Sequence, residues 1–111
     1  MSMETKKEQG VFVISPIGRL DTNTSPDAER LIVEAIDSGE KNVVMDYTST
    51  EYISSAGLRV VLKTAKLLKP KGGVIVVCNG NEQINEVFEI SGFSGMVASF
   101  NSLEEAVSSL S

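Results

Sequence analysis

Two adjacent hydroxyl side chains, Ser54 and Ser55, stand between a short apolar run and a segment with helical periodicity. The run 43–47 (VVMDY) has the length and composition of a buried strand. Downstream, apolar residues recur close to the i, i+3, i+4, i+7 spacing of an amphipathic helix, at Leu58, Val61, Leu62, Ala65 and Leu68. This spacing predicts that both serines lie on a turn at the N-terminus of the helix.

The start of a helix gives these serines two possible roles. It presents unpaired backbone N–H groups and a partial positive charge, so a phosphate attached to Ser54 or Ser55 would be stabilised there. Serine is also a frequent N-cap, and on spacing alone a purely structural cap is the commoner explanation.

Strand and helix patterns alternate along the chain, which predicts an α/β fold with a partly parallel sheet in a single domain, residues 1–111. The polar N-terminal segment is compatible with an added edge strand, and the other strands are expected at 11–17, 42–47, 73–78 and 96–98. Pro16 is better suited to an edge or a strand end than to the centre of a sheet.

Four helices are expected from their start and stop signals. Ser25 is predicted to cap the first, with Pro26 at its first position and Gly39 at its end. The others are expected at 55–69, at 82–91, and after a capping box that begins at Ser102. The loop 18–24 separates the first strand from the first helix.

The inventory of charged and reactive side chains argues against several classes of protein. Ten basic and fifteen acidic residues give a net charge of −5 with the basic residues scattered, which does not favour nucleic-acid binding. No histidine is present and Cys78 is the single cysteine, so we assign no disulfide, metal site, cofactor, catalytic residue or enzymatic activity. No apolar run reaches the roughly 18 residues of a membrane span, and the first residues lack the apolar region of a signal peptide. We therefore expect a cytoplasmic protein with no membrane insertion.

Three further residues have structural explanations. Asp21 alone indicates a turn or capping carboxylate. Asp46, in an apolar strand, is expected at the strand end, where it would accept hydrogen bonds from N–H groups of the 48–50 turn. Gly57 in the first turn of a helix costs about 0.5–1 kcal/mol relative to Ala, which indicates that backbone or a partner approaches closely there.

The chain resembles the STAS family, the domain of bacterial anti-sigma factor antagonists, in three segments. The central one is VVMDYTSTEYISSAGLRVVL, similar to the family signature in which (Asp or Ser)-Ser-(Ser or Ala)-Gly-Leu opens a helix. The others are GRLDTNTSPDAERLI and VFEISGFSGMVASFNSLEEAV. The resemblance implies a small mixed β-sheet with about four helices packed chiefly on one face.

The same resemblance implies a switch. In the family, the residue equivalent to Ser55 is phosphorylated by a serine kinase that is also an anti-sigma factor; Ser54 stands where many members have Asp, and is the alternative acceptor. The unphosphorylated protein would bind the kinase and release its sigma factor, phosphorylation would end binding, and a phosphoserine phosphatase would reset the switch. The implied partner-binding residues are Asp21, Thr22, Ser54, Ser55, Ala56, Gly57 and Arg59. The alternative is an unswitched STAS subunit of a transporter ATPase or another regulatory complex.

Overall fold

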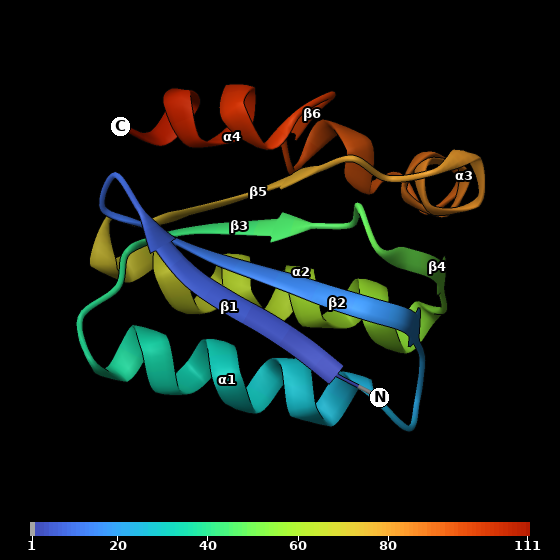
Figure 1. Ribbon diagram of the computed structural model, residues 1–111, viewed down its shortest axis with the longest axis horizontal. Helices are drawn as coiled ribbons and strands as arrows, with labels where there is room; N and C mark the ends of the chain where they lie inside the picture. The colour runs from blue at the N-terminus through green and yellow to red at the C-terminus, as the bar shows by residue number, and fades with distance from the viewer. Residues whose placement is uncertain (1) are drawn as a thin grey trace.

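A mixed sheet of six strands organises the structure, a computed structural model that describes residues 2–111 (Figure 1). Its main path has the order β1-β2-β3-β5-β6, and β4 pairs with β2 outside this path. Only β1 runs antiparallel to its neighbour. The strands are β1 (Ser2–Glu8), β2 (Val11–Leu20), β3 (Asn42–Asp46), β4 (Thr50–Ile53), β5 (Val74–Cys78) and β6 (Ser99–Phe100).

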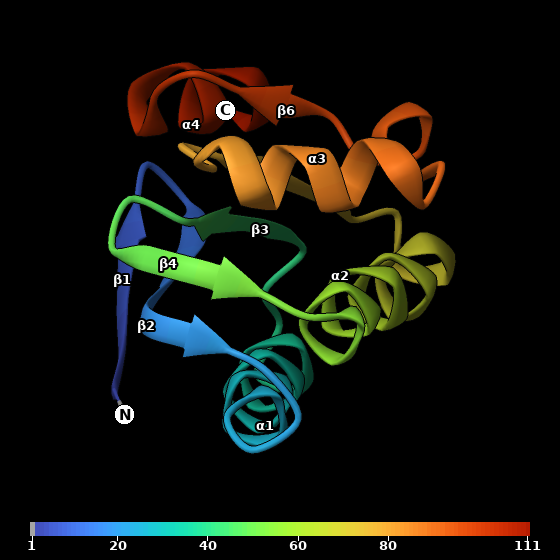
Figure 2. The same ribbon diagram turned by 90° about the vertical axis from the view of Figure 1, so that its right-hand side faces the viewer.

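Four α-helices and two short 3-10 turns accompany the strands, and the last helix follows β6: α1 (Ser25–Asp37), α2 (Ser55–Leu68), η1 (Lys69–Lys71), α3 (Glu82–Ile90), η2 (Phe93–Gly95) and α4 (Leu103–Leu110). The first three α-helices bury apolar side chains in one large core. The last packs on the other face of the sheet, where Ala106 and Val107 join Val44, Val76 and Cys78 in a second core. Figures 1 and 2 both show α4 above β3, with α1 and α2 below it. The expected packing chiefly on one face is confirmed, with α4 as the exception.

The strand predicted at 11–17 is β2, which is longer than predicted and contains Pro16 in its interior. The expected loop 18–24 is wrong in its first half, because β2 continues to Leu20 through an irregularity at Gly18. The expectation of an edge or strand-end position for Pro16 is also wrong. Pairing of β2 with β3 ends at Ile14, and pairing with β4 begins at Gly18. On this side of β2 no strand lies opposite Pro16, so the missing N–H group of the proline costs no ladder hydrogen bond. The carbonyl of Pro16 faces this gap and accepts a hydrogen bond of 2.7 Å from Thr50 Oγ1.

Two further elements differ from the prediction. The strand β4 was not expected, because its four residues show no clear apolar alternation. The last strand lies at Ser99–Phe100 and not at 96–98, because the N–H groups of Met96 and Val97 both turn back to the carbonyl of Phe93. The remaining strands and helices, including the edge strand β1, are confirmed to within a few residues.

Candidate functional site

The serine pair lies at the start of α2, and Ser54 is its N-cap. The Ser54 hydroxyl accepts a hydrogen bond of 3.2 Å from the Ala56 N–H, and the Ser54 carbonyl accepts one of 3.0 Å from Leu58. The Ser54 N–H donates to the carbonyl of Leu20, at the end of β2, over 3.0 Å. Ser54 is therefore half-buried and committed to joining the sheet to the helix.

Ser55 is the first residue of α2, and its side chain is exposed. No hydrogen bond from its hydroxyl is found among the residues that the structure describes. The first turn of α2 contains no acidic residue, so the positive end of the helix dipole is not neutralised there. Arg59 lies one turn later, also exposed, with its Nε 3.5 Å from the Ser55 carbonyl oxygen. The local setting therefore offers an accessible hydroxyl in a positive environment.

A side chain from a distant helix holds the residue before the serine pair. Gln83 of α3 accepts a hydrogen bond from the Ile53 N–H and donates one to the Ile53 carbonyl, each 3.0 Å long. The neighbouring Asn81 donates to the carbonyl of Glu51 over 3.0 Å. These side chains bond the backbone groups on the outer edge of β4, as a neighbouring strand would. Sequence reasoning missed Gln83, because no local signal links residues 30 positions apart.

Gly57 explains how closely α2 approaches the sheet. A Cβ atom on Gly57 would lie 2.7 Å from Ile53 Cγ1 and 2.8 Å from the Leu20 carbonyl oxygen. The expected close approach is thus made by the protein's own backbone and side chains. Because Gly57 is buried, it contributes to the candidate surface by setting the position of α2 and not by direct exposure.

Asp21 and Thr22 begin the loop between β2 and α1. The Asp21 carboxylate accepts hydrogen bonds from the N–H groups of Asn23 (3.0 Å) and Thr24 (3.2 Å), as the predicted turn residue should. Desolvation acts to raise the pKa of Asp21, but these bonds hold it below its ordinary value. The predicted cap at Ser25 is wrong: Thr24 is the N-cap, and Ser25 is buried in the first turn without a hydrogen-bond partner for its hydroxyl. The carboxylate of Asp21 fixes the turn before α1, and the N–H groups of Asp27 and Ala28 bond to the Thr24 carbonyl.

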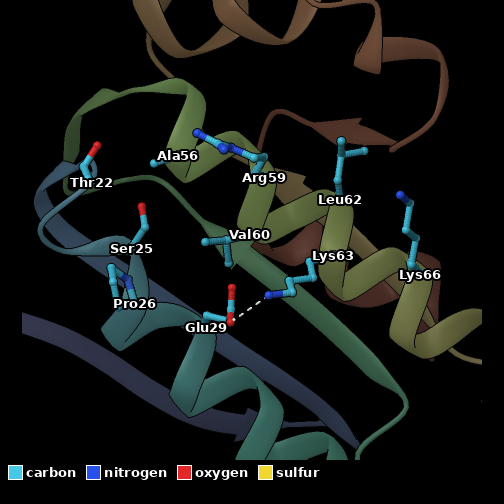
Figure 3. Close-up of a pocket in the computed structure, with 10 residues that line it drawn as sticks. All are labelled: Thr22, Ser25, Pro26, Glu29, Ala56, Arg59, Val60, Leu62, Lys63 and Lys66. Carbon is cyan, nitrogen blue, oxygen red and sulfur yellow. Dashed lines mark hydrogen bonds and ion pairs between the residues drawn. The ribbon is translucent and has the colours of Figure 1, made fainter.

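A groove of about 550 Å³ between α1 and α2 brings part of the candidate surface together (Figure 3). Thr22, Ala56 and Arg59 line it, and Ser55 directly precedes Ala56. Lys63 and Lys66 of α2 extend it, and Lys63 forms an ion pair of 3.1 Å with Glu29 of α1. Of the seven residues proposed for partner binding, Thr22, Ala56 and Arg59 therefore share this groove, whereas Ser54 and Gly57 have mainly structural contacts.

The carboxylate of Asp46 supports the next turn, as expected. It accepts hydrogen bonds from the Thr48 hydroxyl (2.6 Å), the Thr48 N–H (3.1 Å) and the Asn79 amide (3.1 Å). Burial acts to raise the pKa of Asp46, but these bonds outweigh it and lower the pKa. Burial and the nearby Asp46 raise the pKa of the Cys78 thiol to about 12, so this buried thiol acts as a small core residue. Within residues 2–111, no group of three or more His, Cys, Asp or Glu side chains is arranged to hold a metal ion.

Sequence comparison places the chain in a family. The STAS domain profile matches residues 2–106, and the chain belongs to the STAS domain family. BtrV of Bordetella bronchiseptica, which is named as an anti-sigma factor antagonist, is 38% identical over 96% of this chain and 91% of its own length. The anti-sigma F factor antagonist of Paenibacillus polymyxa is 26% identical over 99% of this chain and 95% of its own.

Solved structures share the fold. A Thermotoga maritima protein classed with the anti-sigma factor antagonists superposes with a TM-score of 0.92 at 17% identity, covering 97% of this chain and 93% of that one. The antagonist SpoIIAA in its unphosphorylated form gives a TM-score of 0.84 at 21% identity, covering 97% and 95%. A sulfate transporter family protein from Wolinella succinogenes is less similar, with a TM-score of 0.78 at 12% identity over 93% and 86%. No helix in the described part of the chain is long and apolar enough to cross a membrane.

Proposed function

We propose that this chain is an anti-sigma factor antagonist whose binding is switched at Ser55. In its unphosphorylated form it binds a serine-kinase anti-sigma factor in the cytoplasm and releases the sigma factor; phosphorylation of Ser55 ends the binding. The observation that carries the proposal is the contrast between two neighbouring hydroxyls. That of Ser55 is exposed and makes no hydrogen bond in the described structure, whereas that of Ser54 caps α2.

The start of α2 suits both states of the switch. A kinase can reach the Ser55 hydroxyl without unfolding the helix, since the side chain is already exposed. The added dianion would lie at the positive end of the helix dipole, where negative charge is stabilising by about 0.3–1 kcal/mol, so the fold should survive phosphorylation. Arg59, one helical turn away, supplies a nearby cation.

The names of the relatives support an anti-sigma factor as the class of partner. BtrV and the Paenibacillus polymyxa protein are both named as anti-sigma factor antagonists, and each aligns over nearly the whole chain. In this proposal the chain supplies the phosphate acceptor and the binding surface, the partner supplies the nucleotide and catalysis, and a phosphoserine phosphatase restores the hydroxyl. The surface comprises Thr22, Ala56 and Arg59 in the groove, with Asp21 and Ser55 beside them.

Calorimetry with the purified kinase anti-sigma factor in ADP tests the proposal. Ser55→Ala should bind as wild type does, because the hydroxyl makes no contact that holds the fold. Ser55→Asp should bind more weakly, because burying or opposing a charge at an interface costs about 2–5 kcal/mol, or roughly 30-fold to several thousand-fold in affinity. Ser108→Asp, at an exposed serine of α4 on the other face of the sheet, is the control and should bind normally. Equal binding by all four proteins would favour the unswitched role.

A further inference from the structure

A second cavity lies against α3. It has a volume of about 290 Å³ and is enclosed by α3, β5, β6 and the residue that follows β3. The inner lining is apolar, with Val77, Ile84, Phe88 and Val97 all nearly inaccessible to solvent. Its mouth is polar and consists of Asn85, Glu89 and Ser99. The cavity is separate from the groove between α1 and α2, with which it shares no lining residue.

Tyr47 places an unpartnered hydroxyl in the wall of this apolar space. The side chain is 1% exposed, and its hydroxyl makes no hydrogen bond with any described residue. The ring packs against Phe88 with the ring centroids 6.2 Å apart, so the hydroxyl cannot swing toward another partner as a serine hydroxyl could. Burial raises the pKa of Tyr47 far above the neutral range, so the hydroxyl stays protonated and can donate a hydrogen bond. A buried donor without a partner in the chain is available to a hydrogen-bond acceptor on a bound molecule.

A polar hollow of about 320 Å³ adjoins the cavity and shares Asn85 and Ser99 with it. Its other lining residues carry hydroxyl, amide or backbone groups and no formal charge: Thr48, Asn79, Gly80, Phe100 and Asn101. Asn79 has a positive φ of 61°, in the left-handed region that asparagine adopts more readily than most residues with a side chain.

Both hollows lie where β3, β5 and β6 end. These strands are parallel, and the carboxyl ends of parallel strands form the edge at which open α/β sheets bind ligands. Each volume is near the lower limit of small-molecule sites, and an apolar cavity with a few convergent polar groups is the usual composition of such sites.

We propose that the two hollows form one binding site, the α3 site, for an uncharged small molecule with an apolar body and a hydrogen-bond acceptor. The apolar body would fill the inner cavity, with its acceptor, a carbonyl or ether oxygen, at the Tyr47 hydroxyl. A polar end would lie among the amides of Asn79, Asn85 and Asn101. Glu89 at the mouth and Asp46 behind Asn79 disfavour an anionic ligand. Nothing in this site depends on Ser55.

Nuclear magnetic resonance titrations with two probes of nearly equal shape test the proposal. Acetophenone has a carbonyl oxygen, and ethylbenzene does not. In the wild-type protein, both should give saturable shifts at Ile84, Phe88 and Val97. In Tyr47→Phe the affinity for acetophenone relative to that for ethylbenzene should fall about fivefold, as expected for the loss of one hydrogen bond, while both probes still bind.

A cavity-filling variant provides the second arm. Val97→Phe should abolish the shifts from both probes, whereas Leu67→Phe, at a half-exposed position of α2, should leave them unchanged. If Val97→Phe does not fold, the comparison of wild type with Tyr47→Phe still decides. The proposal is overturned if neither probe gives saturable shifts around α3, if the shifts map to the groove between α1 and α2, or if Tyr47→Phe leaves the relative affinity for the two probes unchanged.

Discussion

The helices α1 and α2 lie side by side and both begin with a serine, yet their first turns differ in exposure and charge. Each has serine at its first position, Ser25 or Ser55, and the third positions are Asp27 and Gly57. Ser25 is 5% exposed, whereas Ser55 is exposed. Asp27 places a negative charge in the first turn of α1, and α2 has none there. A serine at the start of a helix therefore becomes a candidate phosphate acceptor only where the hydroxyl is accessible and the positive end of the helix is unoccupied.

The two helix starts also differ in what holds them. Hydrogen bonds within a few residues fix the start of α1: Thr24 donates from its hydroxyl to the Arg19 carbonyl over 2.7 Å, and Asp21 accepts from Asn23 and Thr24. The start of α2 has a local cap at Ser54 and, in addition, long-range support from Gln83, 30 residues further along the chain, which bonds both backbone groups of Ile53. The position of Ser55 is thus a property of the tertiary structure.

The largest expected effect comes from removing this long-range support. Gln83→Ala leaves the N–H and the carbonyl of buried Ile53 without partners, at about 1–3 kcal/mol for each group, so we expect a loss of about 2–6 kcal/mol in the free energy of unfolding. Urea unfolding measures the loss. Hydrogen exchange should accelerate at 54–57 and not at 25–28. Glu86→Ala, at an exposed position of α3, should stay within about 0.5 kcal/mol of wild type, and equal stability of the two variants would contradict the support assigned to Gln83.

A smaller effect is expected where α2 approaches the sheet. Gly57→Ala introduces a Cβ atom within 2.8 Å of the Leu20 carbonyl oxygen, and such overpacking typically costs about 1–3 kcal/mol. In open space, the same change would stabilise a helix by about 0.5–1 kcal/mol. The sign of the change in thermal unfolding therefore tests the close contact. Asp27→Ala, at the equivalent position of α1, should cost no more than about 1 kcal/mol from the lost interaction with the helix dipole.

The smallest effects distinguish the three serines. Ser54→Ala should destabilise the protein by about 1 kcal/mol through loss of the N-cap. Ser55→Ala should change the stability by less than about 0.5 kcal/mol, because the hydroxyl has no partner to lose. Ser25→Ala should be neutral or stabilising, since it removes a buried hydroxyl without a hydrogen bond. Chemical denaturation of the three variants provides the ranking; a larger cost for Ser55→Ala than for Ser54→Ala would reverse the assignment of cap and acceptor.

Local patterns in the sequence predicted much of this site. The periodicity of 58–68 and the strand at 43–47 located the turn that carries both serines. The cost of glycine in a first helical turn indicated the close approach at Gly57, and the position of Asp46 in an apolar strand indicated a satisfied carboxylate. These inferences succeeded because each depends on a few neighbouring residues.

Features that depend on distant contacts could not be predicted in this way. The strand β4 owes its conformation to pairing with β2 and to the side chains of α3, and Pro16 is tolerated inside β2 only because β3 and β4 leave a gap there. The predicted cap at Ser25 failed because the helix begins one residue earlier: the backbone carbonyls of Asp21 and Thr24 accept from the N–H groups of Ser25 and Asp27. Nothing in the residues around Gln83 shows that its amide reaches Ile53.

Phosphorylation by the cognate kinase with ATP, followed by fragmentation mass spectrometry, tests the central claim most directly. Trypsin separates the two helix starts, because residues 20–30 carry Ser25 and residues 42–59 carry both Ser54 and Ser55. The account predicts one phosphate, located on Ser55, and no phosphate on the peptide 20–30. Phosphate confined to Ser54, or present on Ser25, would contradict the claim that exposure and an unoccupied helix start determine the acceptor.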